Sequence, residues 1–437
     1  PALISALTQA QRLRLRHHAE RLGSGTPRAA RCWSPDADPA EIAAFLAAEE
    51  ARRAMDPAPA NGGPQEAKQL DTRWSSTDTD GSNQGSQGLP ITLTWSIVPD
   101  GTPIPGDDTI GDPSGPSNLR AFMATIYGGD PAGPPDQQPW FIHFQSVFDN
   151  IAAKTGITYV YEPMDDAVQM SFSKPGALGV RGDIRIGGHD FDETAPFDST
   201  LAYNFFPNDG DMVIDTSDDW FLNNKDSPDH IGNLIEHEHG HGLGLNHVCP
   251  DNGTKLMEPF ISTSFDGIQF DDIYSLQRHY GDFHEKHSST RNNDTTTAAA
   301  PINVVPGTPF ATGLVSIDDN DDLDFYRFSI PAGSIITARA IPSTESYLEG
   351  PQNQACTSTT TFDSSNIHNL ALTLIAPDGT TALATANSSP AGQPEEITEV
   401  VTPSSGHHYL KVEGDATNAA QLYRLEVEVL VPAVEIV

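Results

Sequence analysis

The sequence predicts an α+β domain in which a sheet precedes a long helix, with a short helical segment before it and an all-β sandwich after it. Three observations predict this organisation. A chain of 437 residues is too long for one ordinary core. Strand-like segments precede one histidine-rich helix, and short alternating segments separated by turns recur beyond residue 304.

Composition limits the classes of partner. The chain has 24 Lys and Arg against 60 Asp and Glu, a formal charge of −36, which argues against nucleic acid and anionic membranes as partners. The excess acid fits either calcium binding or the solubility of a secreted protein. No apolar run is long enough to span a bilayer, and the first residues lack an export signal, so we expect any such signal to have been removed or to lie outside this chain.

The N-terminal part is predicted to be helical over residues 1–55. One helix covers Leu7 to Leu22, and a second begins at Asp38-Pro39, where Asp caps the helix and Pro suits its first turn, and continues to Met55. Residues 56–87 are rich in Gly, Ser, Asn, Asp, Thr and Pro, which predicts a linker or a loosely held arm. The next domain, residues 88–283, should become compact near Ile91.

This domain begins with strand patterns. A helix with an aromatic stripe follows the first strand, because large apolar residues recur there at spacings of three and four, which favours core packing over a ligand site. The predicted strands are Ile91–Ile97, Ile157–Tyr161, Gly182–Gly187 and Leu201–Phe206, and the stripe consists of Phe141, Phe144, Phe148 and Ile151.

A helix that begins at Ser227-Pro228 carries the residues with the clearest chemistry. His237 and His241 are one turn apart, so both imidazoles can reach one metal ion. Glu238 lies on the neighbouring face, where its carboxylate can reach a water on the metal and act as a general base.

A third metal ligand follows the helix. Gly244 permits a sharp turn, after which the chain can double back and present His247 to the same ion. Three protein ligands leave a fourth position open, as catalytic zinc requires. The complete pattern is H-E-x-x-H-x-x-G-x-x-H, a metzincin signature.

Around this pattern the sequence resembles the matrixin family of metzincin proteases over roughly residues 88–283. Leu256-Met257-Glu258-Pro259 is similar to the Met-turn, with Met257 as an apolar floor under the zinc, and 270–281 is similar to the closing C-terminal helix. Residues 201–207 resemble the edge strand over which these enzymes lay substrate. The resemblance implies a mixed twisted sheet with an active-site helix, and a secreted zinc endopeptidase that hydrolyses proteins or peptides through a zinc-activated water with Glu238 as base.

The resemblance also bears on other metals. Matrixins hold a structural zinc, and His189 with Asp190 or Asp192 could contribute to one here. Tyr203 and Val213 stand at the other two histidine positions, so we predict no structural zinc. Acidic positions around the family's calcium are matched by Asp198, Asp215 and Asp218, which makes calcium a second candidate cofactor.

Cys32 lies in Ala30-Arg31-Cys32-Trp33-Ser34-Pro35-Asp36, which resembles the matrixin cysteine switch P-R-C-G-x-P-D, with Ala30 and Trp33 as departures. In that mechanism a propeptide thiolate takes the open zinc position. The resemblance implies a latent zymogen inhibited by its own pro-segment; the alternative is a free or intermolecularly paired thiol. Cys249 is expected to be structural or disulfide-bonded, with Cys356 as one partner.

Residues 284–304 have linker composition, and residues 305–437 resemble the pre-peptidase C-terminal domain of secreted bacterial proteases. Alternation at 324–328, 369–374, 408–412 and 423–427 predicts its strands. The acidic turn from Asp318 to Asp322 is either a calcium site or a solvated turn.

Two other functions stay open. One is a matrix-binding or adhesion protein with a vestigial zinc site, which the presence of Glu238 disfavours. The other is a self-processing enzyme that removes its own first 60 to 90 residues by cutting the flexible linker. We expect His239 to be an outer-shell or exposed residue, and no metal role for His230, His279, His284 and His287.

Overall fold

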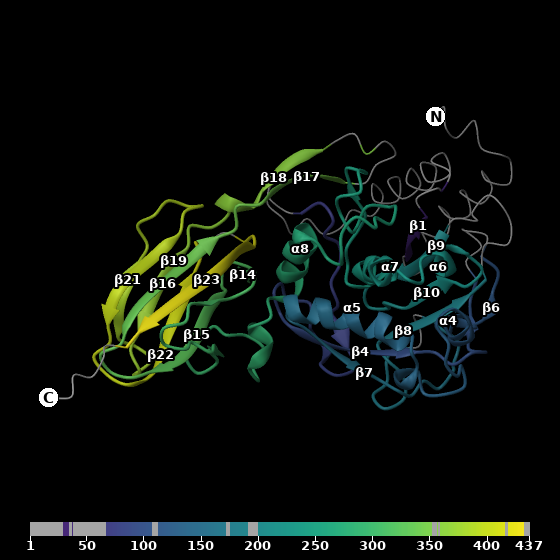
Figure 1. Cartoon of the computed structure of the whole chain (residues 1–437), viewed down its shortest axis with the longest axis horizontal. Coiled ribbons are helices and arrows are strands. Elements are labelled where there is room, and N and C mark those ends of the chain that lie inside the picture. Colours follow the sequence, from purple (N-terminus) through teal and green to yellow (C-terminus); the bar gives the residue numbers. More distant parts are fainter. Residues whose placement is uncertain are drawn as a thin grey trace.

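A computed structural model describes residues 29–34, 37, 67–106, 112–171, 175–190, 200–351, 356, 359–415 and 418–431. Two bodies lie side by side along the long axis, an α/β body formed by the earlier residues and a β body formed by the later ones, with helix α8 between them (Figure 1). The helices predicted within residues 1–55 lie outside the described residues. No helix in the described ranges is long and apolar enough to cross a membrane.

The first body is built on a six-stranded sheet of order β1-β9-β10-β8-β4-β7. Parallel pairing joins β4 to β7 and β8, and β8 to β10, whereas β9 is antiparallel to β10 and to β1. The strands are β1 (Ala29–Trp33), β4 (Ile91–Ile97), β7 (Ile157–Tyr161), β8 (Ile184–His189), β9 (Thr200–Phe205) and β10 (Met212–Asp215). The predictions for β4 and β7 are confirmed, and those for β8 and β9 are displaced by one or two residues.

Helices cover this sheet. The aromatic stripe of α5 is core as predicted, since Phe144 and Phe148 are fully buried and Phe148 stacks on Trp95 of β4 at a centroid distance of 4.3 Å. Helix α7 packs on α5 and on β9. The helices are α4 (Leu119–Tyr127), α5 (Phe141–Lys154), α6 (Trp220–Asn223), α7 (Pro228–Gly242) and α8 (Phe270–Tyr280), with short 3-10 turns at Pro135–Gln137, Glu285–His287 and Ser364–Asn366.

Residues 67–90 differ from the loose arm that their composition predicts. Trp74 is 2% exposed, and its indole Nε1 donates to Gly242 O at 2.7 Å. Arg73 donates to Leu89 O at 2.8 Å and its guanidinium lies over the ring of Tyr280. A polar segment can thus join the core through bonds to backbone carbonyls and one large apolar side chain, a pattern that composition does not reveal. It includes the short strands β2 (Ser76–Thr77) and β3 (Gly81–Ser82).

The second body contains two five-stranded sheets that share one apolar core. One sheet has the order β12-β15-β22-β19-β20, and the other has the order β13-β23-β16-β21 with β14 added on β23. The strands are β12 (Ala300–Pro301), β13 (Phe310–Ala311), β14 (Val315–Ile317), β15 (Leu323–Ile330), β16 (Ile335–Pro342), β19 (Ala371–Ile375), β20 (Ala382–Ala386), β21 (Glu395–Val401), β22 (Gly406–Glu413) and β23 (Gln421–Leu430). The four alternating segments therefore correspond to β15, β19, β22 and β23.

Several contacts join the two bodies. Gln277 on α8 donates to Leu314 O at 3.0 Å, and Asp282 accepts from Ser316 N at 3.1 Å. The small sheet β11-β17-β18 (Val248–Cys249, Ser346–Pro351, Thr360–Asp363) crosses between them. Part of the expected linker 284–304 is packed as well, since Asn293 is fully buried and donates to Asp324.

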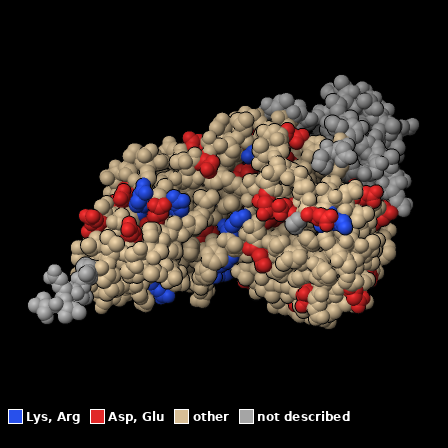
Figure 2. All heavy atoms as spheres, viewed as in Figure 1, with Lys and Arg blue, Asp and Glu red and all other residues tan. Residues whose placement is uncertain are grey.

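Acidic side chains are spread over both bodies on the face shown in Figure 2, and basic side chains are few. The remaining short strands are β5 (Pro103–Ile104) and β6 (Gly115–Pro116), which pair with each other beside the main sheet.

Candidate metal centre

Three histidine nitrogens converge where α7 ends. The Nε2 atoms of His237 and His247 are 3.2 Å apart, and each lies 3.1 Å from Nε2 of His241. The helix supplies the first two ligands one turn apart. Gly244, at φ +93°, then turns the chain so that His247 returns to the same point.

Hydrogen bonds fix how two of these rings present their nitrogens. Nδ1 of His237 donates to Leu256 O and Nδ1 of His241 donates to Leu245 O, both at 2.6 Å. In the neutral rings each Nε2 then carries a lone pair and no hydrogen. The His237 and His241 Nε2 atoms therefore cannot form a hydrogen bond with each other, and both are free to bind a metal ion. Burial lowers the pKa of His237 to about 4, which favours the neutral form that binds metal.

The spacing suits a tetrahedral cation. Ligand bonds of 2.0–2.1 Å place neighbouring nitrogens about 3.3 Å apart in a tetrahedron. The observed edges of 3.1 and 3.2 Å are close to this value, and all three side chains are at most 3% exposed. The residues therefore fit zinc, with one coordination position left for another ligand.

Glu238 adjoins this triangle. Its side chain is fully buried, and none of the described residues donates a hydrogen bond to either carboxylate oxygen. Burial raises the pKa of Glu238 well above its usual range, while the nearby backbone N–H of Cys32 and the charge of Arg31 oppose the rise. A carboxyl group with a raised pKa can accept a proton as a general base and later donate it as a general acid.

The segment around Met257 packs against α7 and orients one of the histidines. Leu256 orients His237 through its carbonyl, and Met257 is fully buried. A Cβ on Gly240 would lie 2.6 Å from Met257 Sδ, so glycine allows the helix to approach the methionine closely. Residues 69–71 brace the loop that carries His247: Asn246 N donates to Gln69 O at 2.6 Å and Asp71 N donates to Gly244 O at 2.9 Å.

Strand β1 brings Cys32 to this centre. Its sulfur lies within 4.8 Å of ligand atoms of His237 and Glu238 and is fully buried. Burial, and then the nearby charge of Glu238, raise the pKa of the Cys32 thiol well above its usual range. The next side chain, Trp33, lies 6.0 Å from the ring of His247 between centroids.

Residues 141–281 match the Peptidase_M10 family model, described as Matrixin. Over these residues the chain is similar to matrixins. No curated protein matches the chain. Among solved structures, the chain is similar to the pre-peptidase C-terminal domain of a collagenase from Bacillus anthracis, with 15% identity over 30% of this chain and 96% of that one and a TM-score of 0.21. It is also similar to PliG of Aeromonas hydrophila, a periplasmic inhibitor of g-type lysozyme, with 14% identity over 30% and 93% of the chains and a TM-score of 0.19.

The calcium group of Asp198, Asp215 and Asp218 stays a prediction, because only two of its three residues are described. Asp198 lies outside the described residues. Asp215 accepts from Ser217 N and Asp218 accepts from Trp220 N, so each carboxylate holds a local turn, and neither joins a metal-type cluster among the residues described.

Other histidines have structural contacts. His189 lies 3.3 Å from Asp112, to which Tyr203 also donates. His239 is buried rather than exposed: its Nε2 meets Tyr159 OH at 2.6 Å on the side of α7 away from the centre, and burial lowers its pKa to about 3.

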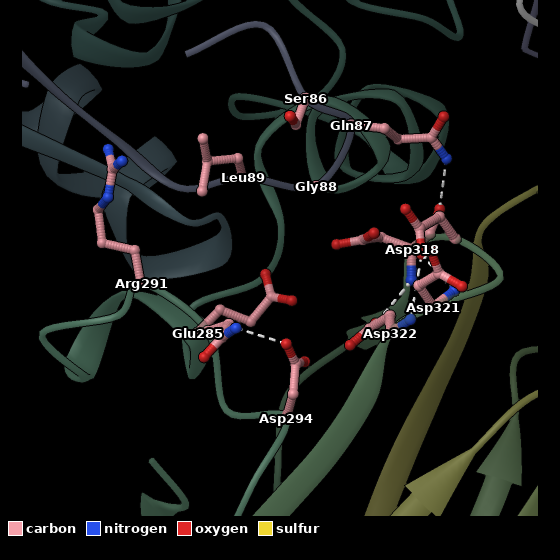
Figure 3. Close-up of a pocket in the computed structure, with 12 residues that line it drawn as sticks. Ser86, Gln87, Gly88, Leu89, Glu285, Arg291, Asp294, Asp318, Asp321 and Asp322 are labelled. Carbon is pink, nitrogen blue, oxygen red and sulfur yellow. Dashed lines mark hydrogen bonds between the residues drawn. The ribbon is translucent and has the colours of Figure 1, made fainter. Parts of the chain in front are cut away.

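A cluster of acidic side chains, separate from the histidine centre, lies between the two bodies. Glu285, Asp318 and Asp322 bring carboxylate oxygens within 4.8 Å of one another, beside a cavity of about 170 Å³ (Figure 3). Asp318 and Asp322 are 3% and 8% exposed, whereas Asn320 and Asp321 between them are exposed, so the turn is solvated only at its tip. One oxygen of Asp322 is buried without a hydrogen bond in the described part of the chain. Burial and neighbouring carboxylates raise the pKa of both aspartates well above their usual range.

Sequence reasoning missed the contribution of Glu285, which lies in what its composition predicts to be a linker. It also did not place Arg31 and Trp33 beside the centre. The sequence contained little indication of these contacts, because each of them joins residues that are far apart in the chain. In contrast, the disulfide predicted as one alternative for Cys249 is present and joins it to Cys356.

Proposed function

We propose that the protein is a secreted, zinc-dependent endopeptidase made as a latent zymogen. The observation that carries the proposal is the triangle of His237, His241 and His247 nitrogens beside the buried carboxylate of Glu238. A purely structural site has no use for a general base at that position.

Each group has a distinct task in peptide hydrolysis. Zinc held by the three histidines supplies Lewis-acid polarisation of water and of the scissile carbonyl. Glu238 removes a proton from the attacking water and delivers it to the nitrogen of the leaving amine. Leu256 and Leu245 keep the rings of His237 and His241 in the tautomer that binds metal.

Protein or peptide substrates are proposed to bind as an added strand on β9. Strand β1 occupies this edge, with Cys32 paired to Ala202, so substrate and β1 would compete for one place. Because burial disfavours the Cys32 thiolate, a cation beside it is what would stabilise the charged form. The Cys32 thiolate is therefore the proposed fourth zinc ligand of the latent state.

An extracellular location is proposed from the disulfide between Cys249 and Cys356, since such bonds persist in oxidising compartments. Calcium is proposed as a second cofactor at Glu285, Asp318 and Asp322. Their three carboxyl groups lie close together, and one oxygen of Asp322 is buried without a hydrogen bond among the described residues.

The test measures cleavage of a mixed peptide library by the zinc-loaded chain and by its Glu238→Ala variant. Each is assayed before and after treatment with a mercurial, which reacts with free thiols. Loss of the base should lower kcat/KM by about 10²–10⁴-fold while the bound zinc, measured by atomic emission, stays unchanged. Asp229→Asn is a matched control, because Asp229 is exposed on the first turn of the same helix. Full cleavage by Glu238→Ala would refute the enzyme proposal, and equal activity with and without thiol treatment would refute latency through Cys32.

A further inference from the structure

Strand β17 belongs to the later part of the chain but lies against the first body. The β17–β18 hairpin extends from the β body toward the α/β body (Figure 1), and β17 is part of neither five-stranded sheet. It pairs with β11, where Val248 faces Pro351 and Cys249 faces Gly350. Because Val248 directly follows His247, this hairpin contacts the backbone beside the third histidine.

The same strand also contacts the segment that holds the other side of His247. Glu349 is 3% exposed, and its Oε2 accepts a hydrogen bond from Lys68 N at 2.9 Å. The next residue, Gln69, accepts from Asn246 N through its carbonyl oxygen at 2.6 Å. Glu349 therefore fixes the segment to which the residue before His247 is bonded.

A third contact of β17 lies beside the first histidine. Nζ of Lys255 is 4.2 Å from the centre of the Tyr347 ring. Lys255 precedes Leu256, whose carbonyl accepts from Nδ1 of His237 at 2.6 Å. Tyr347 and Glu349 are two positions apart and so project from the same face of the strand. One face of β17 thus contacts segments that orient two of the three histidines.

A covalent bond keeps the hairpin in this place. Cys249, at the end of β11, is joined to Cys356, which lies in the connection between β17 and β18. The hairpin and β11 therefore stay together even when the hydrogen bonds between them open.

We propose that β17 positions the metal centre, with Glu349 as the positioning residue for His247, so that tight zinc binding requires this hairpin. The inference rests on the proposed zinc endopeptidase function and adds to it a strand outside residues 141–281, which are the part similar to matrixins. The physical reason is that one helix fixes His237 and His241, whereas His247 comes from a loop. Its place therefore depends on how the two ends of that loop are held, and a ligand that must be ordered during binding lowers the metal affinity.

The experiment measures the zinc affinity of the full chain by competition with a chromogenic chelator, with no peptide substrate present. Glu349→Ala removes the acceptor for Lys68 N and should weaken zinc binding about tenfold, whereas Glu349→Gln keeps an oxygen acceptor and should stay within about threefold of wild type. Leu348→Ala is the matched control and should leave the affinity unchanged, because this neighbouring side chain is 48% exposed.

Cobalt(II) in place of zinc separates positioning from a general loss of stability. The visible absorption of cobalt depends on the arrangement of its ligands, so the spectrum should change in Glu349→Ala while urea unfolding shows that the chain is still folded. A residue that only stabilises the fold would leave both the spectrum and the zinc affinity of the folded chain as in wild type. That result would overturn the inference.

The disulfide gives a second variant that decides the question if Glu349→Ala does not fold. Cys249→Ser/Cys356→Ser releases β11 from the hairpin and should also weaken zinc binding about tenfold. An affinity equal to that of wild type would refute the role of β17.

Failure of the peptidase proposal is a separate outcome. If wild type binds zinc but cleaves no peptide even after thiol treatment, while Glu349→Ala still loses affinity, the enzyme proposal is wrong and the positioning by β17 stands.

Discussion

Gly244 shows how one residue positions the third ligand. Its φ of +93° is a conformation that L side chains rarely adopt, and a Cβ there would lie 1.8 Å from Thr72 O. The glycine therefore allows both the turn to His247 and the close approach of the segment that braces it.

We predict that Gly244→Ala lowers the free energy of unfolding by about 2 kcal/mol or more and weakens zinc binding. Gly232→Ala on α7 is the matched control, because open space surrounds that position and alanine favours a helix by about 1 kcal/mol. Urea unfolding and competitive zinc titration measure both effects. Wild-type zinc affinity in Gly244→Ala would show that the turn does not position His247.

The triad could be predicted from sequence because its geometry is local. His237 and His241 are related by one helical turn, and His247 by one glycine turn, so no distant contact is needed. The tautomers could not be predicted, since one depends on the carbonyl of Leu256 in another loop. The buried state of His239 likewise depends on Tyr159 from a separate strand.

At the scale of elements, α8 is fastened to the segment at 67–90. Arg73 bonds the carbonyl of His279, and the side chain of His279 is 6% exposed. Burial, followed by the charges of Arg73 and Arg278, lowers the pKa of His279 to about 3. The folded chain therefore keeps this histidine neutral.

Between pH of about 6.5 and about 3 the unfolded chain binds the extra proton, so stability falls as pH falls through this window. From pH of about 7.5 to about 5 the His279 contribution is about 2 kcal/mol, and His279→Gln should remove that part of the slope. His407→Gln, at an exposed position, should leave the slope unchanged. Urea unfolding at the two pH values measures this, and parallel slopes for wild type and His279→Gln would contradict it.

The pairing of β11 with β17 places a cross-link two residues beyond His247. Cys249 and Cys356 are 107 positions apart, so their bond restricts the unfolded chain over a long loop. We predict that Cys249→Ser/Cys356→Ser lowers the free energy of unfolding by about 2–4 kcal/mol. Reductant should lower the unfolding midpoint of wild type but not of the double variant; equal sensitivity would show that this bond is not the cause.

Local sequence patterns predicted several regular elements, including β4, β7, α5 and α7, because periodicity or a helix start signal marks each of them. It did not predict the packing of 67–90, since that segment is polar and is fixed by Arg73 and Trp74 through contacts with distant carbonyls. The pairing of β1 with β9 was hidden for a similar reason: its register is set across the fold.

At the scale of the whole molecule, the acidic cluster lies where α8 and its following turn meet the β body. Glu285 comes from the first part and Asp318 and Asp322 from the second, so a shared cation would join them. Without a cation, burial of three carboxyl groups at one place destabilises the contact between the two bodies.

We predict that calcium at a hundredfold excess over its Kd stabilises the chain by about 2.7 kcal/mol and raises its thermal midpoint. Asp322→Asn should remove most of this shift, whereas Glu428→Gln, exposed on the same body, should keep it. Calorimetry with calcium or with a chelator measures the difference. An identical calcium response in Asp322→Asn would exclude this cluster as the site.

The place of β1 in the chain has a consequence for biosynthesis. A ribosome releases Arg31 and Cys32 before it makes Glu238 or any of the three histidines, because synthesis proceeds from the N-terminus. Every newly made molecule therefore forms its three-histidine centre when the β1 segment, which pairs with β9 beside that centre, already exists on the same polypeptide. A peptidase of the proposed kind would therefore be blocked by its own N-terminal strand from the moment its metal centre forms.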